Sequence, residues 1–99
     1  MNIVDKNINK LIKLCKKHKV AKLWVFGSVI TDKFTKESDI DLIVAFDNVD
    51  LQNYADNYYD FKFSIEELFN RKIDLLEEKA IKNPFFKKSI NYSKELIYG

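Results

Sequence analysis

The sequence reads LWVFGS at residues 23–28 and DIDLIVAF at residues 39–46, and these two stretches decide the fold. The first is a continuous apolar run that ends at Gly27, which predicts a strand buried on both faces. The second alternates, so that its two aspartates share one face with Ile43 while the larger apolar residues point the other way. A strand that is buried on both faces, as the first stretch is expected to be, needs covering layers on both sides, or one layer and a partner.

The other expected elements surround these strands. Apolar residues recur at intervals of three and four before the first strand and after the second, which predicts amphipathic helices. Asn83 followed by Pro84 predicts a helix with an asparagine cap and a proline in its first turn. In chain order the sequence predicts a helix over residues 3–18, the two strands with a helical turn over 28–34 and a polar loop over 35–38 between them, a long helix over 51–69 that one break could interrupt, a strand over 72–77, a helix over 84–91 and an edge strand over 96–98.

This order of helices and strands predicts an α/β (α+β) fold. Residues 1–99 are expected to form one small domain with a mixed, mostly four-stranded sheet flanked by helices. An apolar content of 46% and an aromatic content of 14% are typical of a globular chain and argue against disorder. A chain of 99 residues has room for one core, and not for a separate substrate domain.

The charge and cysteine content of the chain limit the cellular compartments that suit it. The formal net charge is +2, but the first 22 residues carry seven lysines and one acidic residue, so the remainder is mildly acidic. A single cysteine, Cys15, cannot form an internal disulfide and suits a reducing compartment. No stretch approaches the roughly 20 apolar residues of a membrane span, and the lysine-rich start does not have the apolar centre of a signal peptide. We therefore expect a cytoplasmic protein that does not enter membranes.

Gly27 and Ser28 stand where a buried strand turns into a helical segment. A glycine there lets the backbone approach a ligand closely, and exposed amides at a helix start favour a phosphate. The alternative is structural: Gly27 makes a tight turn and Ser28 caps the helix.

Three acidic residues interrupt apolar strands. Asp39 and Asp41 are two residues apart, so their carboxylates lie on one face of a strand. Asp74 stands inside the short strand IDLL, and joins them if the two strands are neighbours. Like charges held together favour a bound cation, and carboxylates with substrate phosphates suit Mg²⁺. An isolated pair of this kind is more often a solvated strand end, whereas three acids facing a phosphate cradle favour displacement at phosphorus.

Taken together, these motifs resemble a known family. Gly27-Ser28, ten intervening residues and then Asp39-Ile40-Asp41-Leu42 are similar to the signature of the minimal nucleotidyltransferases of the DNA polymerase β-like superfamily, with Asp74 as the third acid on a later strand. The flanking strands agree with the family, and the similarity covers nearly the whole chain.

The resemblance implies a fold, a reaction and a partner. It implies that Asp39 and Asp41 hold two Mg²⁺ ions, that Asp74 completes the metal site, and that Gly27 and Ser28 bind the β- and γ-phosphates of ATP. A nucleoside monophosphate then passes to a hydroxyl and pyrophosphate leaves. Many such proteins are antitoxins paired with a HEPN-domain toxin, and characterised members adenylylate a toxin tyrosine.

One departure from the family keeps other functions open. Members often continue after Gly-Ser with an Ala-Arg-Gly-like segment, whereas this chain has Thr31 and Asp32 at the arginine and glycine positions. An antitoxin that neutralises its partner by contact, without turnover, therefore remains an alternative. A second alternative within the class is nucleotidylation of a small molecule, with the partner supplying the acceptor site.

Other residues fit structural roles. The N-terminal lysines lie along one helix face without interleaved aromatics, so a solvated surface is expected and nucleic acid is not. His18 is expected to cap the helix C-terminus, and Cys15 to lie in the core. Tyr54, Tyr58 and Tyr59 are expected in the core or against a second subunit.

Overall fold

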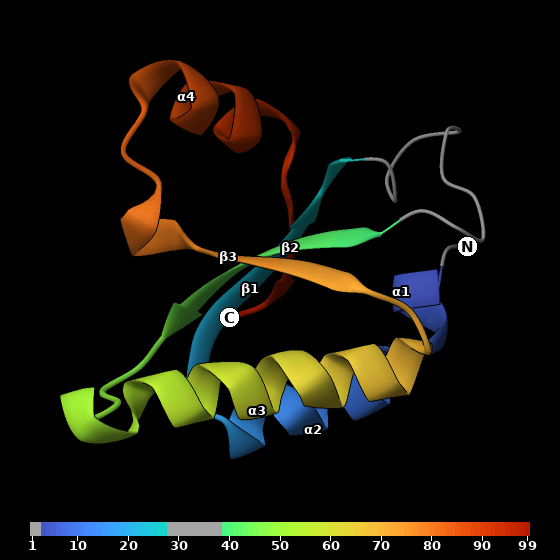
Figure 1. The fold of residues 1–99 in the computed structure, drawn as a ribbon. Coiled ribbons are helices and arrows are strands. Elements are labelled where there is room, and N and C mark those ends of the chain that lie inside the picture. Colours follow the sequence, from blue (N-terminus) through green and yellow to red (C-terminus); the bar gives the residue numbers. More distant parts are fainter. Residues whose placement is uncertain (1–2, 28–38) are drawn as a thin grey trace.

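The computed structural model describes residues 3–27 and 39–99 (Figure 1). In chain order its elements are α1 (Ile3–Lys6), α2 (Ile8–Lys17), β1 (Val20–Phe26), β2 (Ile40–Phe46), α3 (Leu51–Phe69), β3 (Ile73–Glu77), the 3₁₀ turn η2 (Glu78–Ala80), α4 (Pro84–Ser93) and β4 (Glu95–Tyr98). The predicted helical turn over 28–34 and loop over 35–38 lie outside the described residues.

The strands form one mixed four-stranded sheet with the order β3-β2-β1-β4. β1 pairs with β2 and with β4 in the antiparallel direction, whereas β2 and β3 are parallel. Parallel neighbours need a long crossover connection, and α3 supplies it. The predicted α+β fold with a mixed four-stranded sheet is therefore confirmed.

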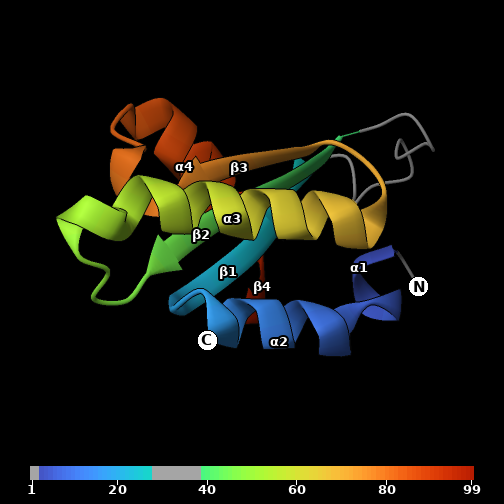
Figure 2. The ribbon, with the colours of Figure 1, turned by 60° about the horizontal axis from the view of Figure 1, so that its bottom comes forward.

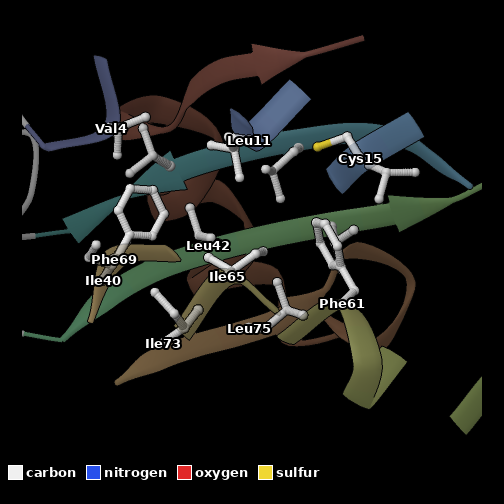
Figure 3. Packing of buried hydrophobic residues seen from close by; sticks show 14 residues of the cluster. Val4, Leu11, Cys15, Ile40, Leu42, Phe61, Ile65, Phe69, Ile73 and Leu75 are labelled. Carbon is white, nitrogen blue, oxygen red and sulfur yellow. The ribbon is translucent and has the colours of Figure 1, made fainter. Parts of the chain in front are cut away.

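The larger core lies between the sheet and helices α2 and α3, which run side by side over one face (Figure 2). Strand residues of alternate positions point into it, as the predicted alternation requires. Figure 3 shows the packing around Leu42, Phe61 and Ile65, all of which are fully buried. Cys15 belongs to this core, as predicted, and burial raises the pKa of its thiol to about 12.

A smaller apolar cluster covers part of the opposite face. Trp24 and Ile43 of the sheet pack there with Ile90, which is the buried residue of α4. The ammonium of Lys94 lies 4.1 Å from the centre of the Trp24 ring, a cation–π contact that continues this cover. The sheet therefore has two unequal faces, one sealed by long helices and one that α4 covers in part.

The prediction of one helix over 3–18 is wrong in one respect, because the structure has two helices there, α1 and α2, separated at Asn7. The Asn7 side chain donates to the Ile3 carbonyl over 2.9 Å, and its backbone N–H bonds to the Val4 carbonyl. Asparagine side chains compete in this way with the helical ladder, so α1 ends and α2 begins anew. His18 ends α2 as predicted, with its Nδ1 donating to the Leu14 carbonyl over 2.9 Å.

The other predicted elements are confirmed, with shifts at their ends. α3 runs through residues 51–69 without a break. α4 begins at Pro84, and the Asn83 side chain accepts hydrogen bonds from the N–H groups of Phe85 and Phe86. β1 begins at Val20, three residues before the predicted start. Within the two described ranges, no helix is both long enough and apolar enough to span a lipid bilayer.

We predict that Phe61→Ala lowers the free energy of unfolding by about 3–5 kcal/mol, because it opens a cavity in the larger core. Phe63→Ala on the same helix is the matched control, since its ring is 57% exposed, and we expect a loss within about 1 kcal/mol. Urea denaturation measures both. Equal losses for the two variants would contradict the described packing of α3.

Candidate functional site

Asp41 and Asp74 lie side by side on neighbouring strands. In the parallel ladder of β2 and β3, Asp41 is the partner of Asp74, and on its other side Asp41 is the partner of Phe26 in β1. Their neighbours Leu42 and Leu75 belong to the larger core, so both carboxylates point to the opposite face. The condition under which Asp74 joins the other acidic residues, that the two strands are neighbours, is therefore met.

The carboxylates form an acidic cluster at one end of this face. Burial raises the pKa of the Asp41 carboxyl, and repulsion from Asp74 and then from Asp39 raises it further. Asp39 directly precedes β2 and is exposed, as is Asp74. α4 lies over the other end of the same strands, away from the starts of β2 and β3 (Figure 1). The cluster is thus partly desolvated at its centre and open at its edges.

Gly27 brings the backbone against this cluster. It directly follows β1 and has φ +79°, a left-handed conformation in which glycine is favoured. A Cβ atom built at Gly27 would lie 2.5 Å from Oδ2 of Asp41, which is closer than real atoms approach. The absence of a side chain therefore allows the Gly27 backbone to lie directly against the Asp41 carboxylate.

The carboxylates of this cluster fit a cation whose remaining ligands come from a substrate. Within residues 3–27 and 39–99, no group of three His, Cys, Asp or Glu side chains forms a ready-made metal site. Mg²⁺ does not need such a cage, because proteins usually bind it through one or two carboxylates together with substrate phosphates. The repulsion that raises the pKa of Asp41 is the electrostatic condition that a cation relieves. One or two carboxylates of this cluster are therefore suited to a metal that is bound together with a phosphate ligand.

Part of the predicted site lies outside the described residues. Ser28, the other predicted phosphate-binding residue, is not among the described residues. The same holds for Thr31 and Asp32 of the segment that departs from the family. Their roles stay predictions. Among the described residues, the Gly27 backbone lies against Asp41, and its role in phosphate binding also stays a prediction.

Two residues of α3 were not predicted to belong near this site. Tyr58 and Glu66 hydrogen-bond the backbone of β3 on either side of Asp74. The sequence predicts Tyr58 only as a core or partner-facing residue and gives no signal for Glu66. Both bond to backbone groups, which leave no trace in the residue pattern.

Comparison with known proteins gives matches in both sequence and fold. The family model described as "Polymerase beta, Nucleotidyltransferase" matches residues 9–99. Protein MJ1379 of Methanocaldococcus jannaschii, provisionally named a protein adenylyltransferase, is 38% identical over 82 residues, which are 83% of this chain and 79% of that protein.

Two solved structures show the same fold. One, provisionally named a minimal nucleotidyltransferase, has a TM-score of 0.77 and 23% identity, and the match covers 96% of this chain and 95% of that one. The other is a complex of a tri-AMPylated HEPN toxin of Shewanella oneidensis with its MNT antitoxin, with a TM-score of 0.65, 21% identity, and coverage of 98% and 73%.

The chain therefore belongs to the polymerase beta nucleotidyltransferase family. Its class of enzyme is nucleotidyltransferase.

We predict that Gly27→Ala costs about 1–2 kcal/mol in unfolding free energy from the left-handed backbone alone. It also displaces the Asp41 carboxylate, which the new Cβ would meet at 2.5 Å. In an Asp41→Ala background the second effect is absent, so the cost of Gly27→Ala should be smaller there. Denaturation of the four chains measures this coupling, and an equal cost in both backgrounds would contradict the close contact.

We predict that Asp41→Asn stabilises the metal-free chain at neutral pH. Because folding raises the pKa of Asp41 above 3.8, the ionised form is disfavoured in the folded state at pH values above the raised pKa. The gain should shrink as the pH falls through the folded pKa, and vanish below about 3.8. Urea denaturation across this range measures it, with Asp47→Asn, an exposed residue, as control. A loss of stability at neutral pH would refute the prediction.

Proposed function

We propose that residues 1–99 form a minimal nucleotidyltransferase domain that transfers AMP from ATP to a hydroxyl group. The acceptor we propose is a tyrosine of a HEPN-domain toxin, for which this chain is the cytoplasmic antitoxin. The observation that carries the proposal is the approach of the Gly27 backbone to Asp41, with Asp74 in the next strand. This arrangement brings backbone that can bind a phosphate next to carboxylate oxygens that can bind a metal.

Each residue then has a defined part. Asp39 and Asp41 would hold two Mg²⁺ ions, and Asp74 would complete the site beside the attacking hydroxyl. When bound, these ions would neutralise the charge that develops on the entering and leaving oxygens. Gly27 and Ser28 would bind the β- and γ-phosphates through backbone N–H groups. The acceptor oxygen bonds to the α-phosphorus, the bond to the bridging oxygen breaks, pyrophosphate leaves and the acceptor proton passes to solvent.

Relatives support the chemistry and the partner. A relative at 38% identity carries the name of a protein adenylyltransferase, although provisionally. The structural neighbour from Shewanella oneidensis is an antitoxin in complex with an AMPylated HEPN toxin. That neighbour shares the fold at 21% identity and supports the proposed partner class for this chain.

Exposed aromatic side chains also support a protein partner. On α4, Phe85 and Tyr92 are 84% and 94% exposed, and seven residues apart they share one side of the helix. Residues 79–94 around them carry five lysines and no acidic residue. On α3, Tyr59 and Phe63 stack with ring centres 5.9 Å apart, and both are at least half exposed. Surfaces that combine aromatics with a charged rim suit protein contacts, and the partner facing α4 would be acidic.

We predict that incubation with labelled ATP, Mg²⁺ and the HEPN-domain protein encoded beside this chain labels that protein. The Asp39→Asn/Asp41→Asn double variant should lower labelling at least 1000-fold, since it removes the carboxylates proposed to hold both ions (roughly 4 kcal/mol of transition-state stabilisation). The matched control is Asp47→Asn/Asp50→Asn, which removes two exposed carboxylates between β2 and α3 and should leave labelling unchanged.

The outcomes separate the candidate functions. A stable complex without labelling would overturn the enzymatic proposal in favour of an antitoxin that acts by contact alone. Labelling of small metabolites and not of the partner would identify a small-molecule nucleotidyltransferase instead.

A further inference from the structure

β3 is an edge strand, and side chains of α3 bond to the edge that no other strand covers. The strand order leaves β3 with one neighbour, β2. The backbone groups on its other side point away from the sheet and need partners from elsewhere. Three side chains of α3 reach β3 at every second residue, the spacing at which an edge strand presents one side. Glu66 and Tyr58 bond to the backbone of Ile73 and Leu75, whereas Tyr54 donates to the carboxylate of the Glu77 side chain.

Two of these contacts bracket Asp74. The N–H of Ile73 donates to Oε2 of Glu66 over 3.1 Å. The hydroxyl of Tyr58 donates to the carbonyl oxygen of Leu75 over 2.5 Å. Burial raises the pKa of Tyr58, and the charges of Glu77, Tyr59 and Asp74 raise it further, so the hydroxyl keeps the proton that it donates.

The position of Asp74 depends on the register of this short strand. β3 has five residues, and it pairs with β2 so that Asp74 stands beside Asp41. A slip of one residue would turn Asp74 to the core face and bring Ile73 or Leu75 into the acidic cluster. Repulsion between Asp41 and Asp74 favours such a displacement, because this register places two like charges on neighbouring strands. Bonds to the backbone on either side of Asp74 oppose it.

We propose that Glu66 and Tyr58 are positioning residues that fix the backbone of β3, and so hold the Asp74 carboxylate beside Asp41 for a divalent cation. This inference rests on the proposed function for the role of Asp74, while the bonds to β3 stand without it. Removal of a group that orients a metal ligand typically lowers the metal affinity by about 10–100-fold. A purely structural role, the protection of a sheet edge, would instead change stability and leave cation affinity alone.

The test uses the full chain with Mn²⁺ as a spectroscopic probe and a non-hydrolysable ATP analogue. In Glu66→Ala we expect amide exchange at Ile73 to accelerate by about tenfold or more, because a charge-assisted hydrogen bond is lost. We expect Mn²⁺ affinity, measured by electron paramagnetic resonance, to fall about tenfold. Glu66→Gln keeps an acceptor oxygen and should restore both. Tyr58→Phe should weaken Mn²⁺ binding less than Glu66→Ala, because a neutral donor is lost.

Matched controls exist on the same helix. Glu67→Ala and Tyr59→Phe alter exposed neighbours of the two positioning residues, and neither should change Ile73 exchange or Mn²⁺ affinity. An Asp74→Asn background supplies the decisive comparison. If Glu66 acts through Asp74, Glu66→Ala should lower Mn²⁺ affinity no further in that background.

The results distinguish the two proposals. Faster exchange at Ile73 with unchanged Mn²⁺ affinity would overturn the positioning role only. The same loss of affinity with and without Asp74 would also overturn it, because Glu66 would then act by another route. A wild-type chain that binds no Mn²⁺ with the nucleotide analogue would overturn the proposed function, while Ile73 exchange would still report on the bond to Glu66.

Discussion

The contact between the end of β1 and the Asp41 carboxylate is the constraint on which the site depends. Asp41 lies in the strand between β1 and β3, so it meets Phe26 on one side and Asp74 on the other. Gly27 then turns with a positive φ so close to Asp41 that a side chain would collide with the carboxylate. A carboxylate is thus held directly against the backbone that follows β1. Such an arrangement costs stability in the free chain and favours a ligand that brings positive charge and phosphate together.

The two faces of the sheet differ: one buries the larger core, and the other carries the acidic cluster. The face toward α2 and α3 buries the larger core, in which Leu42, Phe61 and Ile65 are fully inaccessible. That packing holds strands whose other face carries like charges. The opposite core is smaller and centres on Trp24, Ile43 and Ile90, which leaves the acidic end of the same face uncovered by α4. A strand with alternating residues can serve both faces, and β2 does so within seven residues.

Much of the fold could be predicted from the sequence because its patterns are local. The alternation in residues 39–46 fixes which side chains of β2 enter the core, and Asn83 with Pro84 fixes the start of α4. The break at Asn7 could not be predicted in this way, because the competing bond to the Ile3 carbonyl depends on the conformation of one side chain. The pairing of Asp41 with Asp74 was expected only if the strands were neighbours, since strand order is a tertiary property. Nothing in the sequence indicates that Glu66 binds the N–H of Ile73.

α3 links these features, because one helix serves the core and the edge of the sheet. Phe61, Ile65 and Phe69 face the larger core at helical spacing. Tyr54, Tyr58 and Glu66 lie on the side that turns toward β3. The helix crosses from β2 to β3, so the same segment that makes the parallel connection also supplies the partners for the open edge it creates. A short edge strand can therefore carry a carboxylate against electrostatic repulsion, because its backbone is held by β2 on one side and by α3 on the other.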